Sequence, residues 1–192
     1  MTHMNAEKRV LKYVQGTSEF GVLFSRSETK FELEITVYSD VDWCDDKSDK
    51  KSTSGNIFFL GNTHVSWSST KEHVVNLSSC KSEYIAAYKP SCQGVWLESL
   101  MKGLKVGIGK KMKLLVDNKS AISLANHPTS HGRSKHIKTK FHFIREQVTS
   151  GRVEIEYYKS EEQLVDLLTE ALKRDRFNDL RKLIGVVNVK DF

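Results

Sequence analysis

Short runs in which apolar and polar residues alternate are separated along the chain by longer runs in which apolar residues recur at helical spacing. The alternation, together with many β-branched and aromatic residues, predicts strands over residues 20–25, 32–40, 55–61, 63–69, 111–117 and 153–158. The helical spacing predicts helices over residues 5–15, 79–101, 135–148, 161–171 and 175–183, with a short helix through Ile122 and Leu124. A Gly61-Asn62 pair between two of the strand runs predicts a tight hairpin turn.

The order of these runs predicts an α/β fold with a mixed five-stranded sheet flanked by helices. The strands over 32–40, 55–61 and 63–69 follow one another closely, so they can pair antiparallel. The strands over 111–117 and 153–158 are each preceded by helices, and such crossover connections place strands parallel. We therefore expect three antiparallel strands followed by two parallel strands.

Acidic residues stand at the ends of two predicted strands and on two predicted helices. One strand ends at Asp40 and another at Asp117, while Glu83 and Asp166 lie in helices. In open α/β sheets, sites form outside the carboxyl ends of the strands, so these four side chains are candidates to converge. Converging carboxylates repel one another unless a cation joins them, and Mg²⁺ prefers carboxylate oxygens as protein ligands. Two such ions can promote the hydrolysis of a phosphodiester.

Two of these acids also have a plainer interpretation. Asp117 and Asn118 directly precede a predicted helix, and both residue types are common helix N-caps. Asp166 could equally be a solvent-exposed residue on the surface of its helix. The residue pattern alone leaves these interpretations open.

The composition narrows the class of protein. The 192 residues suit one domain, and the apolar fraction of 39% and charged fraction of 28% are those of an ordinary soluble protein. No apolar run has the ~18–20 residues of a membrane span, and MTHMNAEKRV lacks the apolar core of a secretory signal, so an intracellular location, cytoplasmic or nuclear, is expected. Three cysteines without a CxxC pair argue against structural zinc and a disulfide framework. The tryptophans Trp43, Trp67 and Trp96 are predicted to pack in the core.

Basic residues exceed acidic residues by 30 to 24, which gives a net charge of +6 and a pI near 9.1. This balance is compatible with a polyanionic partner but does not require one. Between Pro128 and Arg145 there are five basic residues and no acidic residue, which makes this window either a phosphate-binding surface or an ordinary solvated face. No cysteine pair accompanies the four histidines of this region to complete a zinc site. These histidines are His127, His131, His136 and His142.

Six motifs occur in order between residues 36 and 185: YSDVDWCDD, KKSTSGNIFFLGNTHVSWSSTK, LSSCKSEYIAA, LLVDNKSAISLA, HGRSKHIKTKFHFIRE and QLVDLLTE. Together they resemble the ribonuclease H domain of copia-type retrotransposon polyproteins. The leading AEKRVLKYVQGTSEFGVLFS resembles the segment that joins the reverse transcriptase to this domain. The resemblance therefore divides the chain into residues 1–30, a helix and strand left from that connection, and residues 31–192, a ribonuclease H-like domain.

The resemblance implies an Mg²⁺-dependent endonuclease that cuts the RNA strand of RNA–DNA hybrids, with Mn²⁺ as a substitute ion. The family's four acids fall on Asp40, Glu83, Asp117 and Asp166, which would be catalytic residues and ligands of two ions. The hybrid would be recognised through its 2′-hydroxyls and its backbone. A reverse transcriptase domain of the same polyprotein is a further expected partner. The residues expected to bind the nucleic acid are Arg133, Lys135, His136, Lys138, Lys140 and Arg145.

Several residues depart from the pattern of that family. Lys81 stands where the family has an acidic residue, which would close a capping box with Ser78. Pro90 stands inside the long predicted helix, where a proline costs about 3 kcal/mol unless the helix kinks. His64 and His73 stand where the family often has proline. These departures support an alternative, a hybrid-binding remnant with little or no catalysis. A DNA strand-transfer enzyme on the same fold is disfavoured, because the four acids match the ribonuclease pattern.

Overall fold

A mixed sheet of five strands forms the centre of the protein. The computed structural model describes residues 3–24, 33–44, 48–76, 78–107, 111–126 and 135–191, with the side chains at 135–138 left out. The strand order across the sheet is β4-β3-β2-β5-β6. The strands are β2 (Ile35–Asp42), β3 (Thr53–Leu60), β4 (Thr63–Lys71), β5 (Met112–Val116) and β6 (Val153–Tyr157).

The strand directions confirm the predicted sheet. β2, β3 and β4 pair antiparallel, whereas β5 pairs parallel with both β2 and β6. The predicted hairpin turn joins β3 to β4, and Gly61 adopts a φ of +62° there, a conformation that glycine reaches without steric cost. Helices connect the parallel strands, as crossover connections require.

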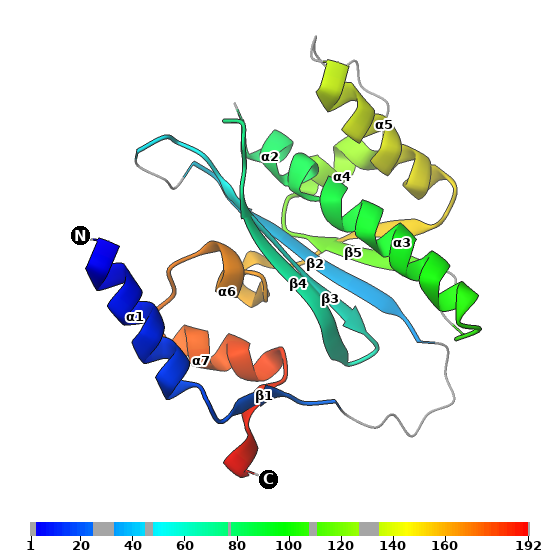
Figure 1. The fold of residues 1–192 in the computed structure, drawn as a ribbon. Coiled ribbons are helices and arrows are strands. Elements are labelled where there is room, and N and C mark those ends of the chain that lie inside the picture. The colour runs from blue at the N-terminus through cyan, green and yellow to red at the C-terminus, as the bar shows by residue number, and fades with distance from the viewer. Residues whose placement is uncertain are drawn as a thin grey trace.

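Helices cover both faces of this sheet (Figure 1). One face carries α2 (Ser79–Ala86), α3 (Tyr88–Gly103), α4 (Lys119–Asn126) and α5 (Lys135–Thr149), and the other carries α6 (Asp166–Thr169) and α7 (Arg174–Leu183). Alternate residues of β2 point to these two layers. Val37 packs in a core with Tyr84 and Phe141, whereas Tyr38 packs against a second core that contains Leu180. The sheet is therefore buried on both sides around β2.

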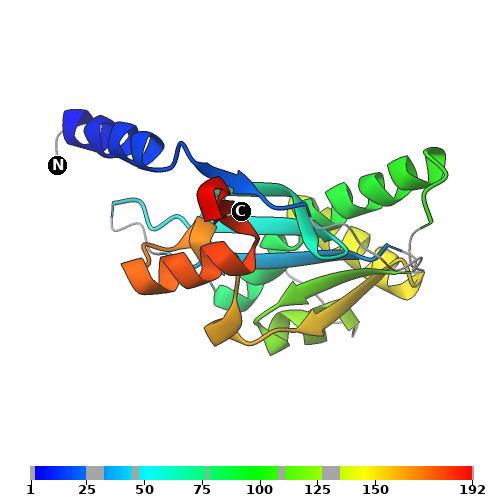
Figure 2. The same ribbon diagram turned by 90° about the horizontal axis from the view of Figure 1, so that it is seen from below.

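The N-terminal and C-terminal parts of the chain form a second, two-stranded sheet. The strand predicted over 20–25 is β1 (Phe20–Val22), and it pairs antiparallel with β7 (Val186–Asn188), which the sequence pattern did not predict. Three-residue strands are too short to show a period of two. Helix α1 (His3–Gly16) has no buried residue, and Figure 2 shows it standing away from the sheet. No helix among the described residues combines the length and the apolar character needed to cross a membrane.

The long predicted helix over 79–101 is two helices, α2 and α3, which meet at Ala87. Pro90 is the third residue of α3, and the first N–H groups of a helix have no intrahelical partner. The break therefore removes most of the cost that an interior proline would impose.

The prediction of a continuous helix over 161–171 was wrong. That segment consists of the 3₁₀ turn η1 (Ser160–Glu162), an extended residue at Gln163 and the single turn of α6. Gln163 is fully buried, and its Nε2 donates to the backbone oxygen of Ser39 at 3.3 Å. This tertiary contact outweighs the local helical preference.

The prediction that the tryptophans lie in the core was also wrong. Trp43, Trp67 and Trp96 are 44%, 58% and 59% exposed. Helix α3 packs on the sheet through a residue without a side chain, Gly94. A Cβ at Gly94 would lie 1.8 Å from Sδ of Met112. A close approach of the helix to the sheet thus leaves no room for the indole ring of Trp96.

Candidate metal centre

Three of the predicted acids meet at the edge of the sheet where β2 and β5 end. Tyr38 of β2 pairs with Leu115 of β5 in parallel register, so both strands reach this edge together, at Asp40 and Asp117. Glu83 enters from the second turn of α2. One carboxylate oxygen from each of Asp40, Glu83 and Asp117 lies within 4.8 Å of the other two. Asp40 was expected at the end of its strand, but β2 continues to Asp42.

The fourth predicted acid, Asp166, lies beside this group at the start of α6. It is not one of the three acids that approach within 4.8 Å. Its negative charge nevertheless contributes to raising the pKa of Asp40, so the two side chains interact. Oδ2 of Asp166 also lies 3.4 Å from Nη2 of Arg176, an ion pair that the sequence pattern gave no reason to expect.

Gly55 allows α6 to approach the sheet next to Asp40. Gly55 pairs with Asp40 across β2 and β3. A Cβ at this position would lie 2.6 Å from Cγ1 of Val165 and 2.9 Å from Cγ2 of Thr169, closer than real Cβ contacts allow. The absence of a side chain at Gly55 therefore sets the position of α6, which carries Asp166 and Thr169.

Two hydroxyl groups orient the carboxylates. Oγ1 of Thr169 donates to Oδ2 of Asp40 at 2.5 Å, and Oγ of Ser160 donates to Oδ2 of Asp117 at 2.8 Å. Sequence reasoning missed both residues, although Thr169 lies in the same QLVDLLTE motif as Asp166. Donors to metal-ligating carboxylates fix the orientation of the free oxygen.

Burial dominates the electrostatics of the two innermost acids. Desolvation raises the pKa of Asp40 to about 7; the bond from Thr169 opposes this shift, while the charges of Asp117 and Asp166 add to it. Desolvation raises the pKa of Glu83 to about 9, and Asp40 and Asp117 add to the shift. Both shifts arise because the charged forms are deprived of water and face one another.

The pKa of Asp166 is raised less, to about 6. Desolvation is the main cause, the charge of Glu170 adds to it, and the hydrogen bond and charge of Arg176 oppose it. Asp166 is therefore half-buried and paired, and the interpretation of Asp166 as an ordinary solvated residue does not hold.

The donor set of the three central acids fits a hard divalent cation. Within the described part of the chain it consists of carboxylates, without a nitrogen or sulfur ligand. Oε2 of Glu83 is buried and has no hydrogen-bond partner among the described residues. A buried and unpaired carboxylate oxygen is costly, and a cation at this point would compensate it.

The interpretation of Asp117 as a helix cap was wrong. Oδ1 of Asn118 accepts the N–H of Ala121 at 3.0 Å, so Asn118 caps α4. Asp117 is left to accept from Ser160 and to face Glu83 and Asp40.

A chain of hydrogen bonds joins the segment after β2 to helix α2. Nε1 of Trp43 donates to the backbone oxygen of Asn76 at 3.0 Å, and Nδ2 of Asn76 donates to Oγ of Ser82 at 3.2 Å. Oγ of Ser52 accepts from Ser82 at 3.4 Å and from the N–H of Cys44 at 3.2 Å. These bonds connect the strand that carries Asp40 to the helix that carries Glu83.

Of the residues expected to bind nucleic acid, the structure describes the side chains of two. Nζ of Lys140 lies 5.5 Å from the ring centre of Tyr88 and borders a hollow of about 120 Å³ that Lys89 and His73 also line. Nε and Nη2 of Arg145 are buried and have no hydrogen-bond partner in the described part of the chain. Arg133 and the histidines His127 and His131 lie outside the described residues, as do the side chains of Lys135, His136 and Lys138.

The sequence is similar over nearly its whole length to retrotransposon polyproteins, although no protein family model matches it. It is 38% identical over 187 residues to the retrovirus-related Pol polyprotein from transposon RE2 of Arabidopsis thaliana, which covers 97% of this chain and 13% of the relative. It is 30% identical over 184 residues to the corresponding polyprotein from transposon TNT 1-94 of Nicotiana tabacum, covering 96% of this chain and 14% of the relative. The chain thus spans only a small part of these relatives.

A solved structure supports the fold. The N-terminal RNase H domain of a Mycobacterium tuberculosis protein, determined as a fusion with maltose binding protein, superimposes with a TM-score of 0.52 at 12% sequence identity. The superposition covers 79% of this chain and 98% of the other. At this identity the likeness concerns the fold.

Proposed function

Because the chain belongs to the Pol family of copia-type retrotransposons and has the ribonuclease H fold, we propose that it cleaves the RNA strand of RNA–DNA hybrids in a reaction that depends on divalent metal ions. The observation that carries the proposal is the convergence of Asp40, Glu83 and Asp117, with one oxygen of Glu83 buried and unpaired.

In this proposal Asp40, Glu83 and Asp117 hold Mg²⁺, or Mn²⁺ in its place, and Asp166 contributes to a second ion. Bound divalent ions would supply an activated water at neutral pH and would stabilise the charge on the leaving oxygen. Burial is the main cause of the raised pKa values of Asp40 and Glu83, and the charges of neighbouring acids add to it; a cation between the carboxylates would offset both effects.

The chain's own residues would prepare the carboxylates for this role. Thr169 occupies Oδ2 of Asp40 and Ser160 occupies Oδ2 of Asp117, so each carboxylate has one oxygen restrained by a donor and one left for a ligand. Arg176 restrains Asp166 in the same way. Such restraint reduces the entropy that a ligand must remove on binding.

The hollow beside α2 would receive a phosphate of the hybrid. Lys89 and Lys140 border it, and Lys89 was not identified from the sequence. Nζ of Lys89 lies 3.9 Å from Oε1 of Glu72, so a phosphate would compete with this ion pair, in which the lysine is about half exposed and the glutamate is largely buried. Contacts of this kind position the duplex without reading its sequence.

We extend the proposal to the first part of the chain and to its partner. Residues 1–30 would derive from the connection to a reverse transcriptase of the same polyprotein. The exposed apolar side chains of α1, such as Val10 and Leu11, are compatible with contact to another domain.

A hybrid-binding remnant without catalysis is the second candidate. It is supported by Lys81, a cation in the first turn of α2, which has no acidic residue there. Ser78 still caps this helix, with its Oγ accepting the N–H of Lys81 at 3.4 Å, and the helix break accommodates Pro90. These two observations favour the active enzyme.

The test is cleavage of an end-labelled RNA–DNA hybrid with Mg²⁺ and with chelator. We expect RNA-strand cutting by the wild type with Mg²⁺ and none by Asp40→Asn. Hybrid binding without cutting by the wild type would instead establish the second candidate. Cutting that survives both chelation and Asp40→Asn would contradict the proposed centre.

A further inference from the structure

Among the four predicted acids, Asp166 differs from the others in being paired with a cation. Nη2 of Arg176 lies 3.4 Å from Oδ2 of Asp166, and the two side chains are 34% and 16% exposed. Asp40, Glu83 and Asp117 approach one another instead, and no basic side chain in the described part of the chain forms an ion pair with them. A charge of the protein itself therefore already stands beside the acid expected to hold the second ion.

Arg176 is placed against the preference of its own helix. It is the third residue of α7, and the N-terminal turn of a helix repels positive charge. Asp166 begins α6, which packs against α7, so the ion pair joins the first turns of two helices. A guanidinium is not deprotonated in proteins, so this positive charge is permanent.

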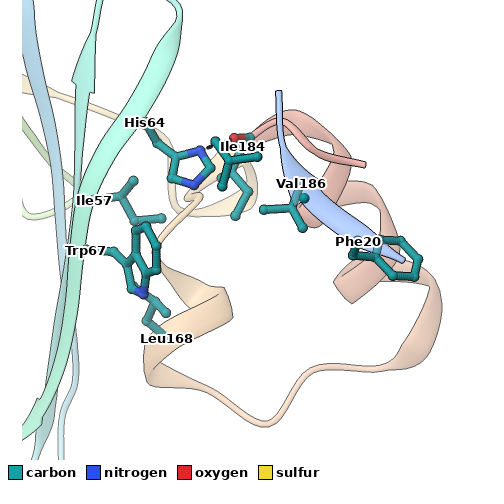
Figure 3. A pocket seen from close by; sticks show the side chains of 9 residues that line it. Phe20, Ile57, His64, Trp67, Leu168, Ile184 and Val186 are labelled. Carbon is teal, nitrogen blue, oxygen red and sulfur yellow. Dashed lines mark hydrogen bonds between the residues drawn. The ribbon is translucent and has the colours of Figure 1, made fainter. Parts of the chain in front are cut away.

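Helix α6 is fixed to the sheet on the side of the small sheet. Leu168 of α6 lies with Ile57 and Trp67 at the wall of a cavity of about 300 Å³ (Figure 3). Oγ of Ser69 in β4 donates to the backbone oxygen of Leu168 at 2.8 Å. With the helix held here, side chains and not α6 itself must adjust when Asp166 takes up an ion.

Arg176 differs from the two hydroxyl groups that restrain Asp40 and Asp117, because it brings a full charge. Its contact at 3.4 Å is long, whereas Ser160 donates to Asp117 at 2.8 Å, so the orienting effect of Arg176 is small. Coulomb repulsion falls only with the inverse of the distance, so this charge opposes any divalent ion held by Asp166. Repulsion therefore outweighs restraint at this acid.

We propose that Arg176 is a positioning residue that acts as an internal counter-ion for Asp166 and makes this acid the weaker of the two ion sites. The inference rests on the proposed function, because it concerns the second of the two ions. Asp40, Glu83 and Asp117 take up an ion without a competing cation, whereas Asp166 takes one up only against the charge of Arg176. The two sites should therefore fill one after the other as the metal concentration rises.

The experiment titrates the full chain with Mn²⁺, counting bound ions from the electron paramagnetic resonance signal of the free ion and measuring affinities by calorimetry. We expect the wild type to bind a second ion more weakly than the first. Arg176→Met removes the charge and retains an apolar chain of similar length, so it should bind the second ion about 10-fold more tightly. An unchanged or weaker affinity for the second ion in Arg176→Met would overturn the proposal.

Two matched variants test whether the position of the charge is responsible. Arg176→Lys keeps a positive charge and should bind the second ion as the wild type does. Arg174→Met removes a charge from the same turn of α7, but Arg174 is exposed and has no ion-pair partner in the described part of the chain, so it should leave the second affinity nearly unchanged. Equal gains in Arg176→Met and Arg174→Met would show that net charge is the cause and would overturn the proposal.

Two further variants assign the ions to their acids. Asp166→Asn should lose the second ion, and Arg176→Met added to it should not restore that ion. Asp40→Asn should lose the first ion; a wild type without any ion that Asp40→Asn removes would overturn the metal centre and this inference together. A first ion that binds as expected, with a second ion that does not respond to Arg176→Met, would overturn the inference alone.

Discussion

The carboxylates of Asp40 and Glu83 are buried, and burial raises their pKa values. The stability of the folded protein should therefore depend on pH. In the folded chain their pKa values are raised to about 7 and about 9, whereas an unfolded chain would have the ordinary values of 3.8 and 4.5. The folded state therefore binds protons more tightly than the unfolded state. Its relative stability is highest below the ordinary values and is lost as the pH rises through about 7 and then about 9.

We therefore expect the melting temperature of the chelated protein to fall between pH 5 and pH 9, by several degrees. Mg²⁺ binds the ionised carboxylates of the folded state and should flatten this fall, with an effect that grows with pH. Scanning calorimetry across this range, with chelator and with Mg²⁺, measures both curves. Asp40→Asn serves as the control, since it removes one of the two titrating groups and should give a shallower fall. Parallel curves with and without Mg²⁺ would contradict a cation site among these acids.

The hydroxyl of Thr169 is the most direct positioning contact in the centre. Removing it in Thr169→Val keeps the shape of the side chain but takes the donor from Oδ2 of Asp40. We expect Mg²⁺ affinity, or hybrid cleavage at low Mg²⁺, to fall about 10- to 100-fold, as is usual for groups that orient metal ligands.

Thr169→Ser is the matched control, because it retains the hydroxyl and loses only a methyl group. Its Mg²⁺ dependence should lie close to that of the wild type. If Thr169→Val and Thr169→Ser lower Mg²⁺ affinity equally, packing of the methyl group and not the hydrogen bond would be the cause.

At the scale of elements, Gly55 couples the sheet to α6. A methyl group added in Gly55→Ala would meet Val165 and Thr169 at distances that force α6 away from β3. Overpacking of this kind costs about 1–3 kcal/mol, and the displaced helix carries Asp166. We expect urea unfolding to show that loss of stability and hybrid cleavage to fall with it.

Gly103→Ala provides the comparison for that variant. No atom lies within 4 Å of a Cβ at Gly103, and the residue ends α3. The change should be neutral or should stabilise by up to about 1 kcal/mol. Equal behaviour of Gly55→Ala and Gly103→Ala would show that α6 does not depend on the close approach at Gly55.

The elements with a clear sequence pattern were predictable, and so was the meeting of three of the four acids. The central strands are rich in apolar and β-branched residues, and the parallel pairing of β2 with β5 brings Asp40 and Asp117 to one edge. The parts that were missed depend on contacts between segments distant in sequence. Gln163 breaks a helical pattern because it bonds to Ser39, and β7 exists because it pairs with β1.

The supporting residues of the centre could not be predicted for a similar reason. In the sequence, Thr169 and Ser160 are ordinary polar residues. The fold brings them next to Asp40 and Asp117, which lie 129 and 43 positions earlier in the chain. Gly55 looks like a strand glycine without special meaning until α6 is packed on it. The contact of Nδ1 of His64 with the carbonyl oxygen of Ile184 likewise joins residues 120 positions apart in the chain.

On the scale of the whole molecule, the charge distribution indicates which surface should face a nucleic acid. The net charge is +6, and the basic side chains of Lys89 and Lys140 border the hollow on the helical layer that also carries Glu83. Lys111 lies directly before β5, at the opposite edge of the sheet from Asp117, where its Nζ lies 3.7 Å from Glu154. The two edges therefore offer a matched pair of lysines for one measurement.

Each lysine that neutralises a phosphate releases a counterion, so it contributes to the slope of log affinity against log salt concentration. We expect Lys140→Ala to weaken hybrid binding and to reduce this slope by about 1, while Lys111→Ala leaves both unchanged. Fluorescence anisotropy with a labelled hybrid, in chelator to prevent cleavage and at several salt concentrations, gives both values. Equal slopes for wild type and Lys140→Ala would place the hybrid on another surface. A reduced slope in Lys111→Ala would show that affinity depends on the total charge of the protein and not on the lysines at the hollow beside α2. Only a change confined to Lys140→Ala connects the phosphate contact to the side of the sheet where the acids converge.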